Sequence, residues 1–211
     1  MNAMNLNKLL IALLILSAAG LLAFLPVEDN FADRLEIGAK APLTDLEVTD
    51  VSGEVLTLEE VAGENGLLVN FSCNTCPWVE AWEDRYNPIS KMADENGIGV
   101  IMLNPNAAIR DDGESMEDMQ ARAKSSGYNF YYALDEGAKM AEAFGATRTP
   151  DIFLFNSDMK LVYTGAIDDN AKSAQAVDQH YLKDAIQNLV AGKEIDPKTT
   201  KALGCTIKWP K

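Results

Sequence analysis

The order of apolar and polar positions along this chain predicts several short β-strands. Residues 46–58, LEVTDVSGEVLTL, alternate apolar and polar side chains on both sides of a Ser-Gly turn, a pattern typical of a β-hairpin. Residues 151–156 and 161–166 flank a second turn signal and predict a second hairpin. The continuous apolar runs at residues 66–71 and 98–104 are typical of buried strands. These segments predict a sheet with a buried centre.

The segments between and after these strands have helical character. A helix is expected over residues 77–87, and Pro88 is expected to kink or interrupt its continuation to residue 96, because proline lacks the N–H that the helix interior needs. Three further helices are expected, over residues 114–126, 137–144 and 176–191. The resulting order of hairpin, strand, helix, strand, helices, hairpin and helix predicts an α/β fold with a central mixed β-sheet flanked by helices. The first hairpin is expected as an N-terminal extension of this fold.

An unbroken apolar run, LLIALLILSAAGLLAFL at residues 9–25, precedes the globular part. Lys8 stands before it and acidic residues follow it, which is the charge arrangement of an export signal held with its N-terminus in the cytoplasm. Residues 1–26 are therefore expected to be an N-terminal hydrophobic helix that acts as a signal peptide or membrane anchor. An uncleaved anchor is slightly favoured over a cleaved signal. Either alternative places the rest of the chain in an exported compartment, periplasmic or extracytoplasmic, where disulfides persist.

The domain boundaries expected from these patterns follow in chain order. Residues 27–38 form a polar linker, residues 39–193 form the globular domain, and residues 194–211 form a tail. The tail is irregular but carries Cys205 and Trp209, so it is expected to pack back on the domain.

Composition and net charge bear on the class of partner that the chain binds. The hydrophobic content of 47% is that of a chain with a buried core. The formal net charge is −14, and no cluster of Lys and Arg stands out, so a nucleic-acid partner is not expected because phosphate backbones need a basic surface.

The stretch FSCNTCPWVE, residues 71–80, places Cys73 and Cys76 three positions apart on a predicted strand-to-helix turn. Pro77 supports a helix start here, because the missing N–H of proline is not needed in the first turn. Free backbone N–H groups and the positive end of the helix dipole favour a thiolate, so a lowered pKa is expected for Cys73. A low-pKa thiol with a second thiol beside it is the arrangement that thiol–disulfide exchange requires.

Three other interpretations of this spacing stay open. A zinc site would need two more ligands, and only Cys205 and His180 remain, without the usual second pair. A structural disulfide closing so small a loop would constrain little of the unfolded chain. A copper-delivery domain would use Cys73, Cys76 and His180. The redox dithiol is favoured over all three.

Two segments, LLVNFSCNTCPWVEAWEDRY and GATRTPDIFLF, together resemble the thioredoxin-like superfamily in its peroxiredoxin-like (AhpC/TSA, redoxin) branch. The closing GCTIKW is similar to the tail of bacterial members of that branch. The resemblance covers roughly residues 37–209 and implies a thioredoxin-like fold. It also implies a cis peptide bond between Thr149 and Pro150, packed against the cysteine pair, with the Thr149 backbone open to pair with an extended substrate.

The resemblance leaves a reductase and a peroxidase as alternatives. Related peroxidases have a Thr-x-x-Cys pattern and a later arginine. On this chain Cys73 falls in the place of the threonine, Cys76 in that of the peroxidatic cysteine, and Pro150 in that of the arginine. Arg148 lies two residues earlier, where it could stabilise a thiolate, although a solvated loop charge is favoured. These departures favour dithiol–disulfide chemistry.

Cys205 is the third cysteine and has no assigned partner. It could resolve a disulfide with Cys73 or Cys76, which an odd cysteine in an exported chain suggests. A buried, unreactive thiol in a docked tail, beside Ile207 and Trp209, is favoured over that role.

The sequence therefore predicts a thiol–disulfide oxidoreductase of the cell envelope, with a peroxiredoxin-like thiol peroxidase of antioxidant activity as the alternative. Cys73 is expected to attack and Cys76 to resolve. Thr149 and Pro150 are expected to bind substrate. Accessory roles are possible for Arg148 and Cys205.

The expected partners follow from this chemistry. The Cys73–Cys76 dithiol is itself the redox centre, so no bound cofactor and no metal are expected. Substrates are protein thiols or disulfides, or a hydroperoxide, and electrons come from another thiol protein. Contact with the membrane is expected through residues 9–25.

Overall fold

The computed structural model describes residues 33–210 of the chain. The expected signal or anchor at residues 1–26 and the first half of the expected linker, residues 27–32, lie outside the described residues. Within residues 33–210, no helix has the length and apolar character needed to cross a membrane.

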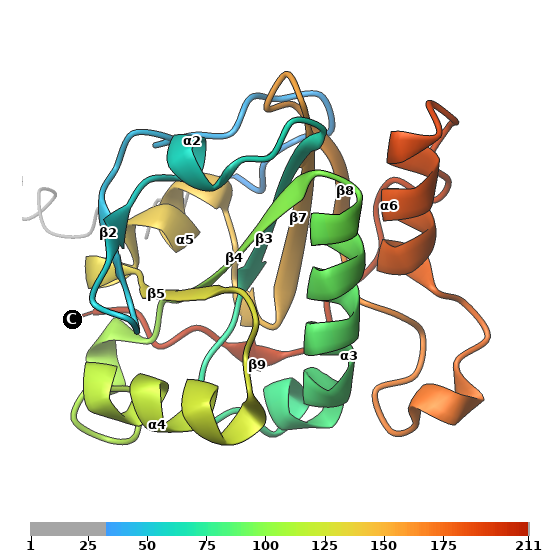
Figure 1. The fold of residues 1–211 in the computed structure, drawn as a ribbon. Helices are drawn as coiled ribbons and strands as arrows, with labels where there is room; N and C mark the ends of the chain where they lie inside the picture. The colour runs from blue at the N-terminus through green and yellow to red at the C-terminus, as the bar shows by residue number, and fades with distance from the viewer. Residues whose placement is uncertain (1–32, 211) are drawn as a thin grey trace, which may run out of the picture. The chain divides into compact units, whose positions relative to one another are not determined.

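The centre of the fold is a mixed β-sheet built from two ladders. The first has the order β2-β1-β5-β4, and the second has the order β3-β7-β8. Their strands are β1 (Val48–Asp50), β2 (Val55–Leu56), β3 (Gly66–Phe71), β4 (Ile98–Asn104), β5 (Tyr131–Leu134), β7 (Asp151–Asn156) and β8 (Leu161–Gly165). β4 and β5 are parallel, and the other neighbouring strands within the two ladders are antiparallel. β3 lies beside β4, so the ladders meet in the middle of the molecule (Figure 1).

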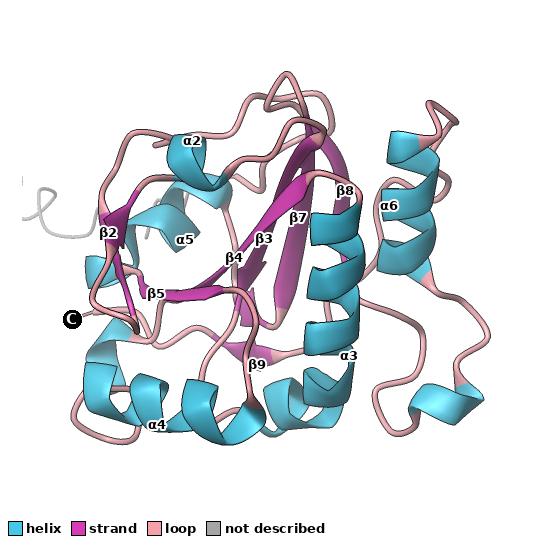
Figure 2. Ribbon diagram, viewed as in Figure 1, coloured by secondary structure: helices cyan, strands magenta, loops and turns pink. Residues whose placement is uncertain are grey.

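Helices cover both faces of this sheet (Figure 2). Their bounds are α2 (Leu58–Val61), α3 (Pro77–Glu95), α4 (Met116–Ser126), α5 (Lys139–Phe144) and α6 (Tyr181–Val190), with short 3-10 turns η1 (Ala107–Ile109), η2 (Glu136–Ala138) and η3 (Ala174–Ala176). Alternate strand side chains point to opposite faces, so each face has its own core. Leu68, Met102 and Leu154 pack with α3 and α6, whereas Leu67 and Phe153 pack with α2 and α5.

The second core contains a cluster of aromatic rings that holds α5 to the sheet. The Phe71, Phe144 and Phe153 rings meet edge to face, with centroids 5.3–5.7 Å apart. All three side chains are fully buried. Such pairs contribute about 0.5–1.5 kcal/mol each beyond the burial of their area. This cluster fixes the end of β3, from which the cysteine loop departs.

The helices differ from the sequence prediction in two places. α3 runs without interruption from Pro77 to Glu95, so the expected interruption at Pro88 is wrong, while a kink there stays a prediction. Its buried face, which includes Trp82 and Tyr86, packs along the sheet on both sides of the proline. α6 starts at Tyr181 rather than near residue 176, because the intervening residues are held by side chains of the preceding loop: the Asn170 amide donates to the Ala176 carbonyl at 2.9 Å, and the Asp169 carboxylate accepts from the Asp178 N–H at 3.1 Å.

The C-terminal tail lies against the domain. Its strand β9 (Cys205–Thr206) pairs antiparallel with β6 (Arg148–Thr149), in the register Thr149↔Cys205 and Arg148↔Thr206. Ile207 is buried in the second core. The tail therefore reaches the segment that directly precedes Pro150.

Candidate redox site

The cysteine loop begins just after β3 and ends at the start of α3. Cys73 stands two residues beyond Phe71, and Cys76 is the residue that precedes the first turn of α3, with Pro77 in the first helical position. Cys76 thus occupies the N-cap position of α3 rather than lying inside its first turn. Its backbone is extended, and no side chain accepts a capping hydrogen bond at the helix start. The first N–H groups of α3 therefore face the site as unpaired donors of positive partial charge.

Thr149 is the residue on which both cysteines converge. The Cys73 Sγ lies 3.1 Å from the Thr149 Oγ1, and the Cys76 Sγ lies 3.2 Å from the Thr149 carbonyl oxygen. The peptide bond between Thr149 and Pro150 is cis, as the family resemblance implies. The Thr149 side chain is fully buried. The structure thus brings together four of the residues singled out in the sequence.

A disulfide joins Cys76 to Cys205 in this structure, and Cys73 is a free thiol. The expectation that Cys205 is an unreactive thiol is therefore wrong. The Cys73–Cys76 disulfide expected from the sequence is not the pair formed here. Since the oxidised Cys76 carries no proton, its approach to the Thr149 carbonyl is a contact in this state and becomes a possible hydrogen bond only in the thiol form.

The Cys73 thiol is held in its protonated form. Burial and, to a smaller extent, the nearby Glu114 carboxylate together raise its pKa from 9.0 to about 11, against the hydrogen bonds that lower it. Only 1% of Cys73 is exposed. The lowered pKa expected for this cysteine is therefore wrong, because desolvation and a like charge outweigh the helix start.

Glu114 is a functional residue that sequence reasoning missed. Its carboxylate is fully buried beneath the loop between the two cysteines. One oxygen accepts from the Thr75 N–H at 3.0 Å and the Thr75 hydroxyl at 2.7 Å, and the other accepts from the Asn74 N–H at 2.8 Å. Asn104 and Asn106 donate to it from the far side, at 2.7 and 3.3 Å. This carboxylate fixes the conformation of the cysteine loop.

The sequence offered only a weak signal for this carboxylate. Glu114 stands between Gly113 and the helix cap Ser115, where a solvated or capping charge is the usual interpretation. Its five donors come from the cysteine loop and from the end of β4 with the residues that follow it, so its burial depends on the tertiary fold. Tyr132, from a strand the sequence did not reveal, adds a hydrogen bond from its hydroxyl to the Asn74 side chain at 2.9 Å.

Arg148 does not reach the cysteines. Its guanidinium donates to the Gly204 carbonyl oxygen at 3.0 Å and is exposed. The positive charge of Arg148 therefore lies against the tail and not beside a thiolate. It gives no support to a peroxide-activating role.

Trp78 provides an exposed apolar surface beside the disulfide. It lies two residues after Cys76, is 41% exposed, and its ring lies 5.9 Å from that of the buried Trp82. An exposed tryptophan next to a reactive sulfur is suited to contact with a polypeptide partner.

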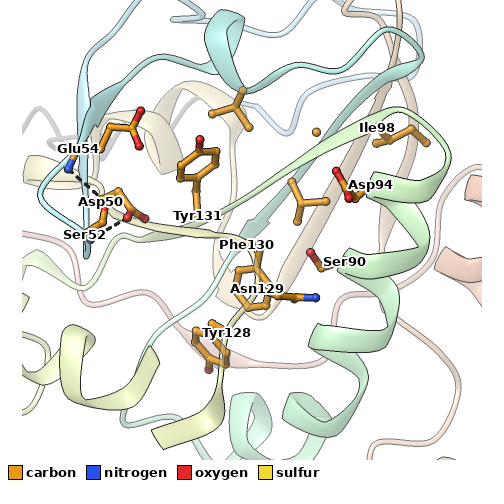
Figure 3. A pocket seen from close by; sticks show the side chains of 13 residues that line it. Asp50, Ser52, Glu54, Ser90, Asp94, Ile98, Tyr128, Asn129, Phe130 and Tyr131 are labelled. Carbon is orange, nitrogen blue, oxygen red and sulfur yellow. Dashed lines mark hydrogen bonds between the residues drawn. The ribbon is translucent and has the colours of Figure 1, made fainter. Parts of the chain in front are cut away.

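Two features of the described residues lie outside this sulfur chemistry. Among residues 33–210, no group of three or more His, Cys, Asp and Glu side chains could hold a metal ion. An open hollow of about 550 Å³ is lined by Asp50, Glu54, Asp94 and Tyr131, among others, and contains no cysteine (Figure 3). It is separate from the cysteine loop and does not bear on the redox site.

Comparisons with known proteins agree with this geometry. A family model described as Redoxin matches residues 36–180. The thiol-disulfide oxidoreductase ResA of Bacillus anthracis is 30% identical over 164 residues, which cover 75% of this chain and 88% of that relative. A hypothetical protein of Sinorhizobium meliloti 1021 has a TM-score of 0.77 and 29% identity, covering 84% of this chain and 97% of that one.

A further solved structure, a peroxidoxin BcpB of Mycobacterium tuberculosis, bears on the fold. It has a TM-score of 0.57 at 12% identity and covers 75% of this chain and 98% of that one. An identity this low supports only the architecture. The α/β fold with a central mixed sheet flanked by helices is therefore thioredoxin-like, as the family resemblance implies.

Proposed function

Because the chain belongs to the redoxin family and is an oxidoreductase, we propose that it exchanges thiols and disulfides in protein substrates, with Cys73 and Cys76 as its redox dithiol. The observation that carries this proposal is the convergence of both sulfurs on Thr149, with a third cysteine already joined to Cys76. Sulfur exchange needs a disulfide and, within reach of it, a thiol that can lose its proton. The Cys76–Cys205 disulfide and the Cys73 thiol meet at this site.

The order of the two cysteines in the proposed reaction is the reverse of that expected from the sequence. Cys73 is buried and its pKa is raised to about 11, which makes it a poor attacking group at neutral pH. Cys76 is also buried, at 4% exposed, but it stands at the start of α3 and is bonded to the tail cysteine, so it is the sulfur that pairs with another segment in this structure. These facts support Cys76 as the attacking thiol and Cys73 as the resolving thiol.

The proposed reaction transfers two electrons. The Cys76 thiolate attacks one sulfur of a substrate disulfide, a mixed disulfide forms, and the second substrate sulfur leaves as a thiolate. Cys73 loses its proton and attacks the Cys76 sulfur, so that a Cys73–Cys76 disulfide forms and the first substrate sulfur leaves as a thiolate. An external dithiol protein then reduces the enzyme.

We also propose that the enzyme works in an exported compartment, tethered through residues 9–25. The apolar run after Lys8 supports the tether. The Cys76–Cys205 disulfide supports an oxidising compartment, because such bonds persist outside the cytoplasm.

Reduction of insulin by the full chain tests this function. The reduced protein is expected to cleave insulin disulfides with turnover when a dithiol is supplied. Cys76→Ser abolishes turnover, Cys73→Ser stops it at the mixed disulfide, and Cys205→Ser serves as a matched control that keeps it. An intact chain that leaves insulin disulfides uncleaved would refute the proposal.

The disulfide between Cys76 and Cys205 also favours a second candidate, a thiol peroxidase. In that reaction the Cys76 thiolate takes an oxygen from a hydroperoxide, becomes a sulfenic acid, and releases an alcohol or water. The Cys205 thiol then displaces water to form the disulfide. Rapid peroxide consumption that Cys205→Ser slows, without insulin cleavage, would select this candidate.

A further inference from the structure

The C-terminal strand β9 lies where an extended partner of the redox site would lie. Cys205 stands opposite Thr149 in antiparallel pairing, and its sulfur is bonded to Cys76. The pairing continues one residue further, where the Ile207 N–H donates to the Thr147 carbonyl at 3.1 Å. A strand that adds to an exposed edge is a recurrent mode of peptide recognition, in which main-chain bonds supply affinity.

Main-chain groups of the tail make most of the contacts on both sides of Cys205. Before it, the Gly204 carbonyl accepts from the Arg148 guanidinium at 3.0 Å. After it, the Lys208 carbonyl accepts from the Ala108 N–H at 3.0 Å, and the Lys208 N–H donates to Asn106. Ile207 supplies a buried side-chain anchor. An unrelated segment could therefore repeat most of these contacts.

Gly204 sets a steric requirement on such a segment. A Cβ at this position would collide with the carbonyl of Thr149 and press on the Pro150 nitrogen, and all of these atoms belong to the backbone. Backbone of a buried strand cannot move aside in the way that a flexible side chain can. The residue before the bonded cysteine therefore has to be glycine for the strand to lie this close.

We propose that residues 204–207 are a tethered substrate, and that among extended polypeptide segments the site prefers those in which glycine directly precedes the reactive cysteine. The inference rests on the proposed function and adds its substrate class. The state with the Cys76–Cys205 disulfide is then the latent enzyme, with its own tail in the substrate position.

Release of the tail needs no outside oxidant. The Cys73 thiol loses its proton and attacks the Cys76 sulfur, a Cys73–Cys76 disulfide forms, and Cys205 leaves as a thiolate that takes up a proton. The number of disulfides is unchanged. An external dithiol can instead reduce the Cys76–Cys205 bond and leave all three cysteines as thiols.

The test uses the full chain carrying Cys205→Ser, reduced, together with two synthetic peptides. The first peptide has the sequence of residues 203–209, and the second carries Gly204→Ala. In each peptide the cysteine forms a mixed disulfide with an aromatic thiol that becomes coloured when Cys76 displaces it. We expect the glycine peptide to react at least about tenfold faster than the alanine peptide, and the oxidised wild-type chain to react with neither.

In the Cys205→Ser chain the tail can stay docked and cover the site, so a second variant is used to release it. Adding Ile207→Ser removes the buried anchor of the tail, and this double variant is expected to react faster than Cys205→Ser alone with the glycine peptide. Equal rates for the two peptides with both variants would overturn the inference. Insulin cleavage by the same preparations separates the two proposals: if it is intact, only the tethered substrate has failed, and if it is absent, the proposed function has failed too.

Discussion

The substitution Glu114→Gln isolates the contribution of the buried carboxylate to the cysteine loop. Glutamine has nearly the same shape but replaces one acceptor oxygen with a donor group. The oxygen with fewer partners in the structure accepts from the Asn74 N–H and the Asn104 amide. Even in the better orientation, the new amide therefore faces two donors that lose their acceptor.

The expected loss of stability follows from these two donors. A buried donor left without an acceptor costs about 1–3 kcal/mol, so the free energy of unfolding is expected to fall by about 2–5 kcal/mol after some relaxation. With a urea dependence of about 2 kcal/mol per molar, the unfolding midpoint of the oxidised protein shifts down by about 1–2.5 M.

Urea unfolding of the full chain with the Cys76–Cys205 disulfide intact measures this effect. Glu117→Gln is the matched control, because Glu117 is exposed in the first turn of α4 and its loss is expected to cost less than about 1 kcal/mol. A midpoint for Glu114→Gln equal to that of the control would refute the assigned role of this carboxylate.

The same variant has a second expected effect, on Cys73. The Glu114 charge raises the pKa of this thiol, so its removal lowers the pKa and speeds alkylation at neutral pH, by about tenfold for each unit. An alkylation rate that is unchanged in the folded variant would mean that burial alone sets the pKa.

Three further predictions concern the thiol and the tail. In the oxidised wild-type chain, alkylation of Cys73 should rise with pH up to about 11 rather than level off near 9.0, because burial holds the proton on; a plateau near 9.0 would contradict the raised pKa. Gly204→Ala should lower the stability of the oxidised chain by about 1–3 kcal/mol in urea, against no loss for the exposed Lys201→Ala. Arg148→Ala should leave insulin turnover within about twofold, because its guanidinium contacts the tail and not a sulfur; a loss of a hundredfold would restore a role at the thiolate.

Much of the sheet could be predicted from the sequence because its strands carry local signals. β3 and β4 were predicted from continuous apolar runs, and β7 and β8 from the turn signal between them. β5 was missed, because only four residues, YYAL, pair in it and the first is exposed. So short an apolar run, without alternation, does not distinguish a strand from other structure, and its pairing with β1 and β4 defines it as a strand.

The site could be predicted only where its signals are local. The position of Cys73 and Cys76 at a strand-to-helix turn could be predicted, because the apolar strand before them and Pro77 after them lie within a few consecutive residues. The family resemblance added Thr149. The partner of Cys76 could not be predicted, since Cys205 is 129 positions away and the pairing depends on how the tail docks. The raised pKa of Cys73 was also beyond the sequence, because it comes from burial and from a carboxylate supplied by another loop.

The central proposal is that Cys76, and not Cys73, attacks the substrate disulfide. The most direct test is to identify which of the two cysteines bonds to the substrate. The full chain carrying Cys73→Ser and Cys205→Ser is reduced, mixed with insulin, quenched in acid and mapped by mass spectrometry, beside a matched chain carrying Cys76→Ser and Cys205→Ser. An insulin adduct is expected to accumulate on Cys76 in the first chain, while the second chain is expected to form little adduct. An adduct that forms on Cys73 in the second chain, with none on Cys76 in the first, would contradict this proposal.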